Sequence, residues 1–410
     1  MLSQLFVALS LVAFTAASPV VIRNSPVTLP LARRFNTNSG HTIAEIDQSR
    51  AKALKAAVSP AAGNGSGVNP VPVTSSTVIY TAEVLIGSPP QTFNLIVDTG
   101  SSNTWVGANP SNPYVPTASS VNTTDIILIE YGSGLFAGLE YNDTVALGDL
   151  SITNQTIGVA QFALGSFSSE GVDGILGIGP ADLTQSTTAS GDEIPTITDN
   201  AWALGLLEEY EVGISFEPST NSSDANGQLT FGGVDNSKFN GSITYVPITS
   251  TAPASGYVGI EQSVTYGSSN VPILEFTSGI VDTGTTMLVI ASDAFATYQN
   301  LTGAVLDNTT GLLKITPAQY DNLESLFFNI GGETFELTKN AQIWPRSLNS
   351  AIGGDADSIY LIVSNLGTPS GEGLDFINGY GFLQRFYAVY DTVNSRVGFA
   401  TTPFTFAETN

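Results

Sequence analysis

The sequence predicts an all-β protein built from two similar lobes that face each other across a cleft. From Thr77 onward, short runs rich in β-branched and apolar residues alternate with turns containing Gly and Asn, which is typical of strands. A seven-residue pattern, Ile-Val-Asp-Thr-Gly followed by two hydroxyl residues, also recurs once, 184 residues further along the chain. That spacing is far too long for a solenoid repeat and instead indicates two related halves.

The N-terminal 60 residues differ in composition from the rest. Residues 1–17 have the pattern of a secretory signal peptide, because an apolar run over 5–13 precedes small residues at 16–18. Residues 18–60 are basic and rich in Ala, with a helical pattern over 43–58. We interpret them as a prosegment; a surface helix of the first lobe is the alternative. The segment 59–76 is rich in Gly, Ser, Pro and Asn, so the prosegment boundary could lie as late as residue 72.

The remaining chain would divide into an N-terminal lobe over residues 61–240 and a C-terminal lobe over 241–410. The clearest strand patterns lie at residues 78–86, 92–97, 125–130, 228–231 and 242–246. Helical patterns are few and short, at residues 199–207, 292–302 and 317–327.

Charge is distributed unevenly along the chain. Six of the twelve basic residues lie in the first 55 positions, opposed only by Glu45 and Asp47. From Ala56 onward six basic residues face 34 acidic ones, a formal net charge of −28. Such an acidic body repels nucleic acid and anionic membranes, so neither is expected as a partner. Its acidity could serve solubility alone or adaptation to acid, where many carboxylates are protonated.

Composition also excludes several kinds of catalysis. The chain has no Cys, and its one His is His41, inside the predicted prosegment. Without that segment, neither a Ser-His or Cys-His nucleophile nor a zinc site built on His or Cys is possible. A Ser-Lys dyad is not formally excluded, but the three lysines of the body lie in no motif that suggests one. Carboxylates and tyrosines remain for acid–base work, and we expect no metal or other cofactor.

Export from the cell fits the rest of the sequence. After residue 17 no apolar run is long enough to span a bilayer. Asn-x-Ser/Thr sequons, which suit a secreted glycoprotein, begin at Asn64, Asn122, Asn142, Asn154, Asn221, Asn240, Asn300 and Asn308. We therefore expect a secreted, extracellular monomer, with a vacuolar destination as the alternative.

The repeated heptapeptide contains the residues that carry chemistry. Asp98 and Asp282 are the only two aspartates followed by Thr-Gly. Each motif is preceded by Ile-Val and followed by two hydroxyl residues, an agreement that two unrelated turns would rarely produce. The glycine allows a tight turn that presents the carboxylate beyond the strand end, and the hydroxyls of Ser101 and Thr285 can hydrogen-bond the carboxylates. Two such turns meeting between the lobes would form a carboxylate pair that shares one proton.

On these motifs the sequence resembles the pepsin-like aspartic protease family. The resemblance also includes Tyr131-Gly132-Ser133-Gly134, which matches the tip of the family's flap, the segment 173–177 (Asp-Gly-Ile-Leu-Gly) and the C-terminal segment 386–391. It covers nearly the whole chain after residue 60. It implies a bilobal fold with the active site between the lobes, and an acid endopeptidase made as a zymogen. Such an enzyme would cleave proteins and peptides beside bulky hydrophobic residues and bind pepstatin.

The resemblance implies a role for each matching position. Asp98 and Asp282 would activate a water molecule as general acid and base. Thr99 and Thr283 would brace the two loops, and Ser101 and Thr285 would orient the carboxylates. The substrate would meet Gly100, Gly284, Gly132, Ser133 and Ile175. Tyr131 would close over it with its hydroxyl near Trp105, although both Trp105 and Ile175 could instead be core residues.

Finer expectations follow as well. Because the first 55 residues carry six bases against two acids and the body is strongly acidic, Lys52 or Lys55 of the prosegment would pair with the two aspartates at neutral pH and leave them in acid. Ser133 stands where some relatives carry an acid that favours Lys before the cleaved bond, so we expect little cleavage after Lys. Asn378-Gly379 replaces the usual Leu-Gly-Asp, which leaves the geometry there open. A catalytically dead relative and a two-carboxylate glycoside hydrolase are the competing readings, but neither explains two intact Asp-Thr-Gly loops.

Overall fold

The computed structural model describes residues 25–35, 41–58, 78–131, 134–165, 171–185 and 187–409. The predicted signal peptide, Gly132 and Ser133 lie outside these ranges, and the side chain of Tyr131 is not described either. Strands dominate the described chain, as the sequence predicts.

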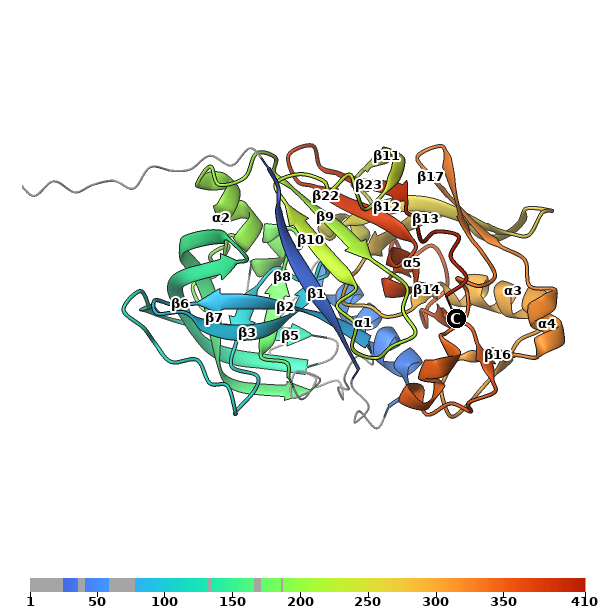
Figure 1. Cartoon of the computed structure of the whole chain (residues 1–410), viewed down its shortest axis with the longest axis horizontal. Coiled ribbons are helices and arrows are strands. Elements are labelled where there is room, and N and C mark those ends of the chain that lie inside the picture. The colour runs from blue at the N-terminus through green and yellow to red at the C-terminus, as the bar shows by residue number, and fades with distance from the viewer. Residues whose placement is uncertain are drawn as a thin grey trace, which may run out of the picture.

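One sheet runs through the middle of the molecule and on into its N-terminal half (Figure 1). Its strand order is β11-β23-β22-β9-β10-β1-β2-β3-β8-β4-β7-β6-β5. The strands are β1 (Val27–Phe35), β2 (Val78–Ile86), β3 (Gln91–Asp98), β4 (Thr104–Val106), β5 (Val121–Tyr131), β6 (Gly134–Leu147), β7 (Leu150–Gly165), β8 (Gly174–Gly177), β9 (Glu211–Phe216), β10 (Gly227–Phe231), β11 (Asn240–Pro247), β22 (Phe386–Asp391) and β23 (Arg396–Thr401).

A second sheet forms the C-terminal half, in the order β18-β17-β12-β13-β21-β14-β20. Its strands are β12 (Gly259–Tyr266), β13 (Val271–Val281), β14 (Leu288–Ile290), β17 (Leu326–Ile330), β18 (Glu333–Leu337), β20 (Val363–Asn365) and β21 (Phe376–Asn378). A small third sheet holds β15 (Val305–Leu306), β16 (Leu313–Ile315) and β19 (Ile359–Tyr360).

In the described ranges all helices but two are short. The described helices are α1 (Ile43–Val58), α2 (Ile197–Ala203), α3 (Ser292–Thr302), α4 (Pro317–Asp321) and α5 (Tyr380–Leu383), with 3₁₀ turns η2 (Ala181–Thr184), η3 (Ala254–Gly256) and η4 (Arg346–Ile352). In this part of the chain no helix is long and apolar enough to cross a membrane.

The helix predicted over residues 317–327 is wrong in its second half. Helix α4 begins at a capping box in which Thr316 and Gln319 exchange side-chain and backbone hydrogen bonds, but it ends at Asp321. Residues Leu326–Ile330 form β17 instead, with alternate side chains buried. This strand pairs with both β12 and β18, so cross-strand pairing outweighs the weak helical pattern. By contrast, the helix predicted over residues 292–302 is confirmed residue for residue as α3.

The N-terminal segment enters the fold in two pieces. Strand β1 lies between β10 and β2 and pairs antiparallel with both. Arg33 of β1 is buried and donates to the carbonyl oxygens of Ser219 and Asn221 at 3.0 and 3.3 Å. Arg33 and Arg34 are adjacent bases, at which a processing protease could cut. Because β1 lies inside the sheet, such a cut would require β1 to leave the sheet. The sequence pattern did not indicate this strand.

Helix α1 is the second piece, and it confirms the helix predicted over residues 43–58. It begins at a capping box, because Thr42 and Glu45 exchange hydrogen bonds of 2.8 and 3.2 Å. Ile43, Ala51 and Leu54 join the large buried apolar cluster that extends through both halves of the molecule. Figure 1 shows α1 in the middle of the molecule, between the green N-terminal half and the orange C-terminal half.

Candidate active site

The two Asp-Thr-Gly motifs lie in matching surroundings in the two halves. In the first half, β3 runs to Asp98, β8 pairs parallel with β3, and β4 pairs antiparallel with β8. In the second half, β13 ends just before Asp282, β21 pairs parallel with β13, and β14 pairs antiparallel with β21. The repeat seen in the sequence is therefore also a repeat of strand arrangement, and each half presents its aspartate at the end of a buried strand.

Reciprocal hydrogen bonds join the two loops. The Thr99 amide donates to Thr283 Oγ1 and the Thr283 amide donates to Thr99 Oγ1, both at 3.0 Å. Thr99 Oγ1 then donates to the Val281 carbonyl and Thr283 Oγ1 to the Val97 carbonyl, again at 3.0 Å. All four bonds are buried, so they fix the position of one loop against the other in a setting where an unmade bond is costly.

Each carboxylate is oriented by its own loop. Asp98 accepts from the Gly100 amide at 3.0 Å and from Ser101 Oγ at 2.5 Å. Asp282 accepts from the Gly284 amide at 3.0 Å and from Thr285 Oγ1 at 2.5 Å. The hydroxyls of Ser101 and Thr285 thus contact the outer carboxylate oxygens (Oδ2). The inner oxygen (Oδ1) of each aspartate faces the loop of the other aspartate.

Glycine is required at both loops because the opposite carboxylate comes so close. A Cβ at Gly100 would lie 2.8 Å from Asp282 Oδ1, and one at Gly284 would lie 2.6 Å from Asp98 Oδ1. Each of these oxygens is held by a hydrogen bond from the glycine amide of its own loop, so it has little room to move aside. Any larger residue would therefore push the two aspartates apart, which gives Gly100 and Gly284 a place at the centre of the site.

Arg50 of α1 occupies the position between the two aspartates. Its Nη2 atom lies 2.5 Å from Asp98 Oδ1 and 2.8 Å from Asp282 Oδ1, and its Nε lies 2.6 Å from Asp282 Oδ2. The expectation that Lys52 or Lys55 would pair with the aspartates is wrong. Lys52 is exposed, and Lys55 reaches Glu372 instead. On a helix, residues 47, 50 and 54 share a face, and that face meets the loops.

Burial and Arg50 have opposite effects on the pKa values of the two aspartates. Burial raises the pKa of Asp98 above its ordinary value; Arg50 opposes this, while the negative charge of Asp282 adds to it. Burial acts on Asp282 as well, but the charge and hydrogen bonds of Arg50, helped by Thr285, outweigh it and hold the pKa of Asp282 below its ordinary value. The pair is therefore split, with Asp98 favouring the protonated form and Asp282 the ionised form.

Asp47 is a further buried acid beside the site, and the sequence did not mark it. Its carboxylate accepts from the amides of Thr286 and Met287, just beyond the second loop, at 3.3 and 2.7 Å. Burial raises the pKa of Asp47 to about 7, despite these two hydrogen bonds. A signal was present in the sequence, since Asp47 and Arg50 are one turn apart on a predicted helix.

Trp105 and Ile175 lie in the core beneath the β5–β6 hairpin. They face each other across β4 and β8, and the Trp105 ring packs 4.5 Å from that of Phe136. Both side chains are almost fully buried in one apolar cluster. Backbone hydrogen bonds carry β5 as far as Tyr131, whose side chain is not described. The proposed contact between Tyr131 and Trp105, like the roles of Gly132 and Ser133, therefore stays a prediction.

The departure at Asn378 is accommodated by a second amide. Asn378 Nδ2 donates to Gln262 Oε1 at 2.9 Å, and Gln262 Nε2 donates to Asn378 Oδ1 at 3.2 Å. Both side chains are fully buried. The backbone oxygen of Asn378 also accepts from the Asp282 amide at 3.2 Å. A neutral, self-satisfied pair thus supports the second loop from behind.

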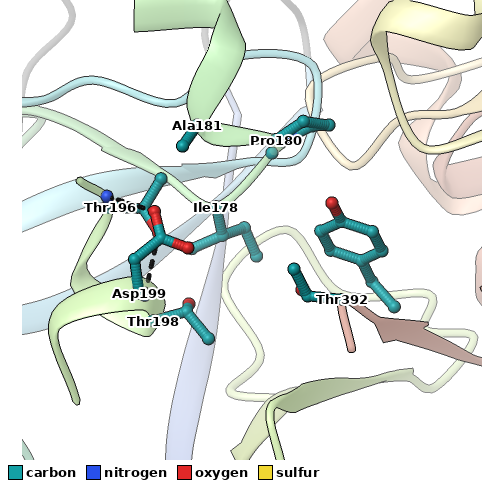
Figure 2. A pocket seen from close by; sticks show the side chains of 9 residues that line it. Ile178, Pro180, Ala181, Thr196, Thr198, Asp199 and Thr392 are labelled. Carbon is teal, nitrogen blue, oxygen red and sulfur yellow. Dashed lines mark hydrogen bonds between the residues drawn. The ribbon is translucent and has the colours of Figure 1, made fainter. Parts of the chain in front are cut away.

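A small cavity lies behind the first loop (Figure 2). It holds about 10 Å³, and residues 178–181, Thr196, Thr198, Asp199, Tyr390 and Thr392 line it. Asp199 points along its wall and accepts from the Thr196 amide at 2.6 Å. A space of this size suits one water molecule at most. It is too small for a substrate, and no group of acidic or imidazole side chains in the described chain could hold a metal ion.

Comparisons with known proteins agree with this geometry. The family model for eukaryotic aspartyl proteases matches residues 79–402. Polyporopepsin from Irpex lacteus is 59% identical over 342 residues, which make up 83% of this chain and 99% of that protein. Pepsin A from Sus scrofa is 31% identical over 335 residues, 78% of this chain and 80% of that protein.

A solved structure is similar as well. The crystal structure of the aspartic proteinase from Irpex lacteus superposes with a TM-score of 0.80 at 52% identity, covering 94% of this chain and 100% of that one. The bilobal fold predicted from the sequence is therefore confirmed. The chain belongs to the pepsin-like aspartic protease family and is an aspartic endopeptidase, an enzyme that hydrolyses peptide bonds at acidic pH.

Proposed function

We propose that Asp98 and Asp282 are the catalytic pair and that the full-length chain is a zymogen in which Arg50 blocks them. The observation that carries this proposal is the position of Arg50 Nη2, which is within hydrogen-bond distance of the inner oxygens of both aspartates. A single water molecule in the same place could contact both carboxylates. The ionised acid would take a proton from that water as its oxygen attacks the peptide carbonyl, and the protonated acid would donate to the carbonyl oxygen.

The zymogen proposal is supported by how α1 binds. Asp47 and Arg50 contact the second loop and the aspartates, and the Leu54 carbonyl accepts from Tyr257 Oη at 2.7 Å. These contacts place the helix over the two Asp-Thr-Gly loops, where a substrate would have to bind. The family match also begins only at residue 79. We infer that residues 18–60 form the prosegment, with cleavage in the connector that follows, up to residue 72.

Acid would release this segment through Asp282. Because its pKa is lowered when Arg50 is bound, the pairing stabilises the docked form above the ordinary carboxyl pKa of about 3.9 and is lost as pH falls through the lowered pKa. Asp47 acts in the opposite direction. Its pKa is raised to about 7, so the docked form is favoured below about pH 4 and loses that contribution as pH rises through 7. Docking is therefore tightest between the lowered pKa of Asp282 and the pKa of Asp47, about 7.

Secretion is supported by the sequence pattern of residues 1–17 and by the sequons. Of the described sequon asparagines, six are exposed: Asn122, Asn154, Asn221, Asn240, Asn300 and Asn308. Asn142 is half-buried and its Oδ1 accepts from Thr156 at 2.8 Å, so it is the weakest candidate for glycosylation. We propose an extracellular, glycosylated, monomeric enzyme, with a vacuolar destination as the alternative.

The finer specificity also belongs to the proposal. We expect cleavage beside bulky hydrophobic residues, inhibition by pepstatin, and little cleavage after Lys because Ser133 is uncharged. The test is cleavage of casein or haemoglobin by the secreted protein at pH 3, with and without pepstatin. Acid activity that pepstatin blocks supports the assignment. Activity that is indifferent to pepstatin, or a chain that stays full-length and inactive at pH 3, contradicts it.

A further inference from the structure

A second polar contact holds the last turn of α1, away from the two aspartates. Lys55 Nζ donates to Thr368 Oγ1 and lies 3.0 Å from Glu372 Oε2. The Lys55 side chain is only 14% exposed, while that of Glu372 is 46% exposed. The ammonium group is thus largely enclosed by the enzyme, although one of its acceptors reaches solvent. This is the arrangement of a shallow binding site for a cation.

The segment that carries these acceptors is held by two carboxylates that do not belong to α1. Asp293 of α3 accepts from the Ser370 amide at 2.9 Å and from Ser370 Oγ at 2.5 Å. Buried Asp375 accepts from the amides of Gly371 and Glu372 at 2.7 and 3.1 Å. Two carboxylates from the enzyme body therefore hold the loop from both sides. Thr368 and Glu372 would keep their positions after α1 has left.

The spacing of Arg50 and Lys55 along α1 relates the Lys55 contact to the position of the bond that would be cleaved. Arg50 and Lys55 are five residues apart, which is about 7.5 Å along a helix axis. An extended peptide advances about 3.3 Å per residue. If the reacting bond lies where Arg50 now meets the aspartates, the acceptors of Lys55 would face a substrate side chain two to three residues away. Gln48 contacts the same side of the site, since its Nε2 donates to the Asn365 carbonyl at 3.3 Å.

We propose that Thr368 and Glu372 form a specificity subsite for a basic side chain of the substrate, two to three residues from the cleaved bond. Lys55 occupies this subsite in the full-length chain. The proposal rests on the proposed zymogen, because it takes α1 to lie along the substrate's path. Chemically, an ammonium or guanidinium group suits one carboxylate and one hydroxyl acceptor. This subsite is distinct from the one beside Ser133, which concerns the residue directly before the cleaved bond.

The test uses activated enzyme and a set of fluorogenic octapeptides that share one cleavable Phe-Phe bond. Lysine, norleucine or glutamate is placed in turn at the second and third positions on each side of that bond. The measured quantity is the ratio of kcat/KM for the lysine peptide to that for the norleucine peptide, at pH 5, where carboxylates in general are largely ionised. Active enzyme is counted by titration with pepstatin, so misfolded material does not enter the ratio.

We expect one position at which lysine is favoured about 2- to 5-fold over norleucine, as a partly exposed ion pair would give, and at which glutamate is disfavoured. In Glu372→Gln the ratio at that position should fall to about 1, and in Thr368→Val it should fall part of the way. Glu333→Gln, which changes an exposed acid at the start of β18, serves as the matched control and should keep the wild-type ratio.

Two results would overturn the proposal. One is the absence of any position that favours lysine; the other is a preference that survives Glu372→Gln. If Glu372→Gln speeds loss of the N-terminal segment but no lysine preference exists, the contact is an anchor for α1 only. Failure of the proposed function looks different, because the norleucine peptide itself would then not be cleaved in a pepstatin-sensitive way.

Discussion

Replacing Arg50 tests how the N-terminal segment controls the site. In the full-length chain Arg50 is the basic group that contacts both Asp98 and Asp282, through three hydrogen bonds of 2.5 to 2.8 Å. Arg50→Gln removes the positive charge and leaves a shorter neutral side chain. The two aspartates stay buried under α1 without their counter-charge, which disfavours the docked helix.

The size of the effect follows from the burial of the pair. Removing one partner of a buried ion pair costs about 3–5 kcal/mol, because the remaining charge keeps its desolvation penalty. Asp98 can relieve part of this by taking a proton, since its pKa is already raised by burial. We therefore take the lower end, about 3 kcal/mol, which corresponds to a rise of over ~100-fold in the undocked population.

The assay follows the initial rate of a fluorogenic peptide at pH 3.5, just below the pH at which the wild-type segment begins to be released, during the first minute after dilution, with a gel to show that the chain is still full-length. Arg50→Gln should be active at once, whereas the wild-type chain should show a lag while it is processed. Arg50→Lys should lie between them, because lysine keeps the charge but not the forked geometry. The matched control is Lys52→Gln on the exposed face of α1, which should behave as wild type. An Arg50→Gln chain with the same lag as wild type would refute the reasoning.

Three further outcomes are expected. The wild-type chain should keep its N-terminal segment at pH 5 and lose it progressively below about pH 4, as Asp282 is protonated; mass spectrometry of samples held at each pH would show this, and a chain that is equally intact at pH 3 would not fit. Thr99→Val and Thr283→Val should each lower the free energy of unfolding of the mature enzyme in urea by about 2–4 kcal/mol, since each leaves buried partners unpaired; Thr→Ser at the same position keeps the hydroxyl and is the control. Asn378→Leu and Gln262→Leu should each destabilise by about 1–3 kcal/mol, but the double variant by less than their sum, because the buried amides are paired with each other; simple additivity would argue against that pairing.

The site could be predicted from the sequence because its motifs are local. Each Asp-Thr-Gly follows one apolar strand and precedes another. About ten residues of sequence are therefore enough to predict both the turn and its position at the end of a strand. Two copies then imply that the loops meet. The hydrogen bonds between Thr99 and Thr283 follow from that meeting, and the structure contains them.

The N-terminal segment was harder to predict because its contacts are long-range. Strand β1 contains Pro30 and two arginines, a composition more typical of an edge strand; its residues 27–31 pair with β10 and its residues 31–35 with β2, so it joins two strands that are distant in the sequence. Which base of α1 meets the aspartates depends on how the helix is rotated about its axis. Sequence alone places Arg50, Lys52 and Lys55 on one helix but does not say which face is buried, and the charge balance of the segment does not distinguish Arg50 from the two lysines.

The catalytic assignment is tested most directly by single amide substitutions at the two aspartates. Asp98→Asn and Asp282→Asn should each reduce kcat on casein at pH 3 by more than ~10³-fold, because the loss of either group removes the acid or the base. Both variants should remain folded, and Asp321→Asn, at an exposed acid that ends α4, should keep full activity. Near-normal, pepstatin-sensitive activity in either aspartate variant would contradict the account.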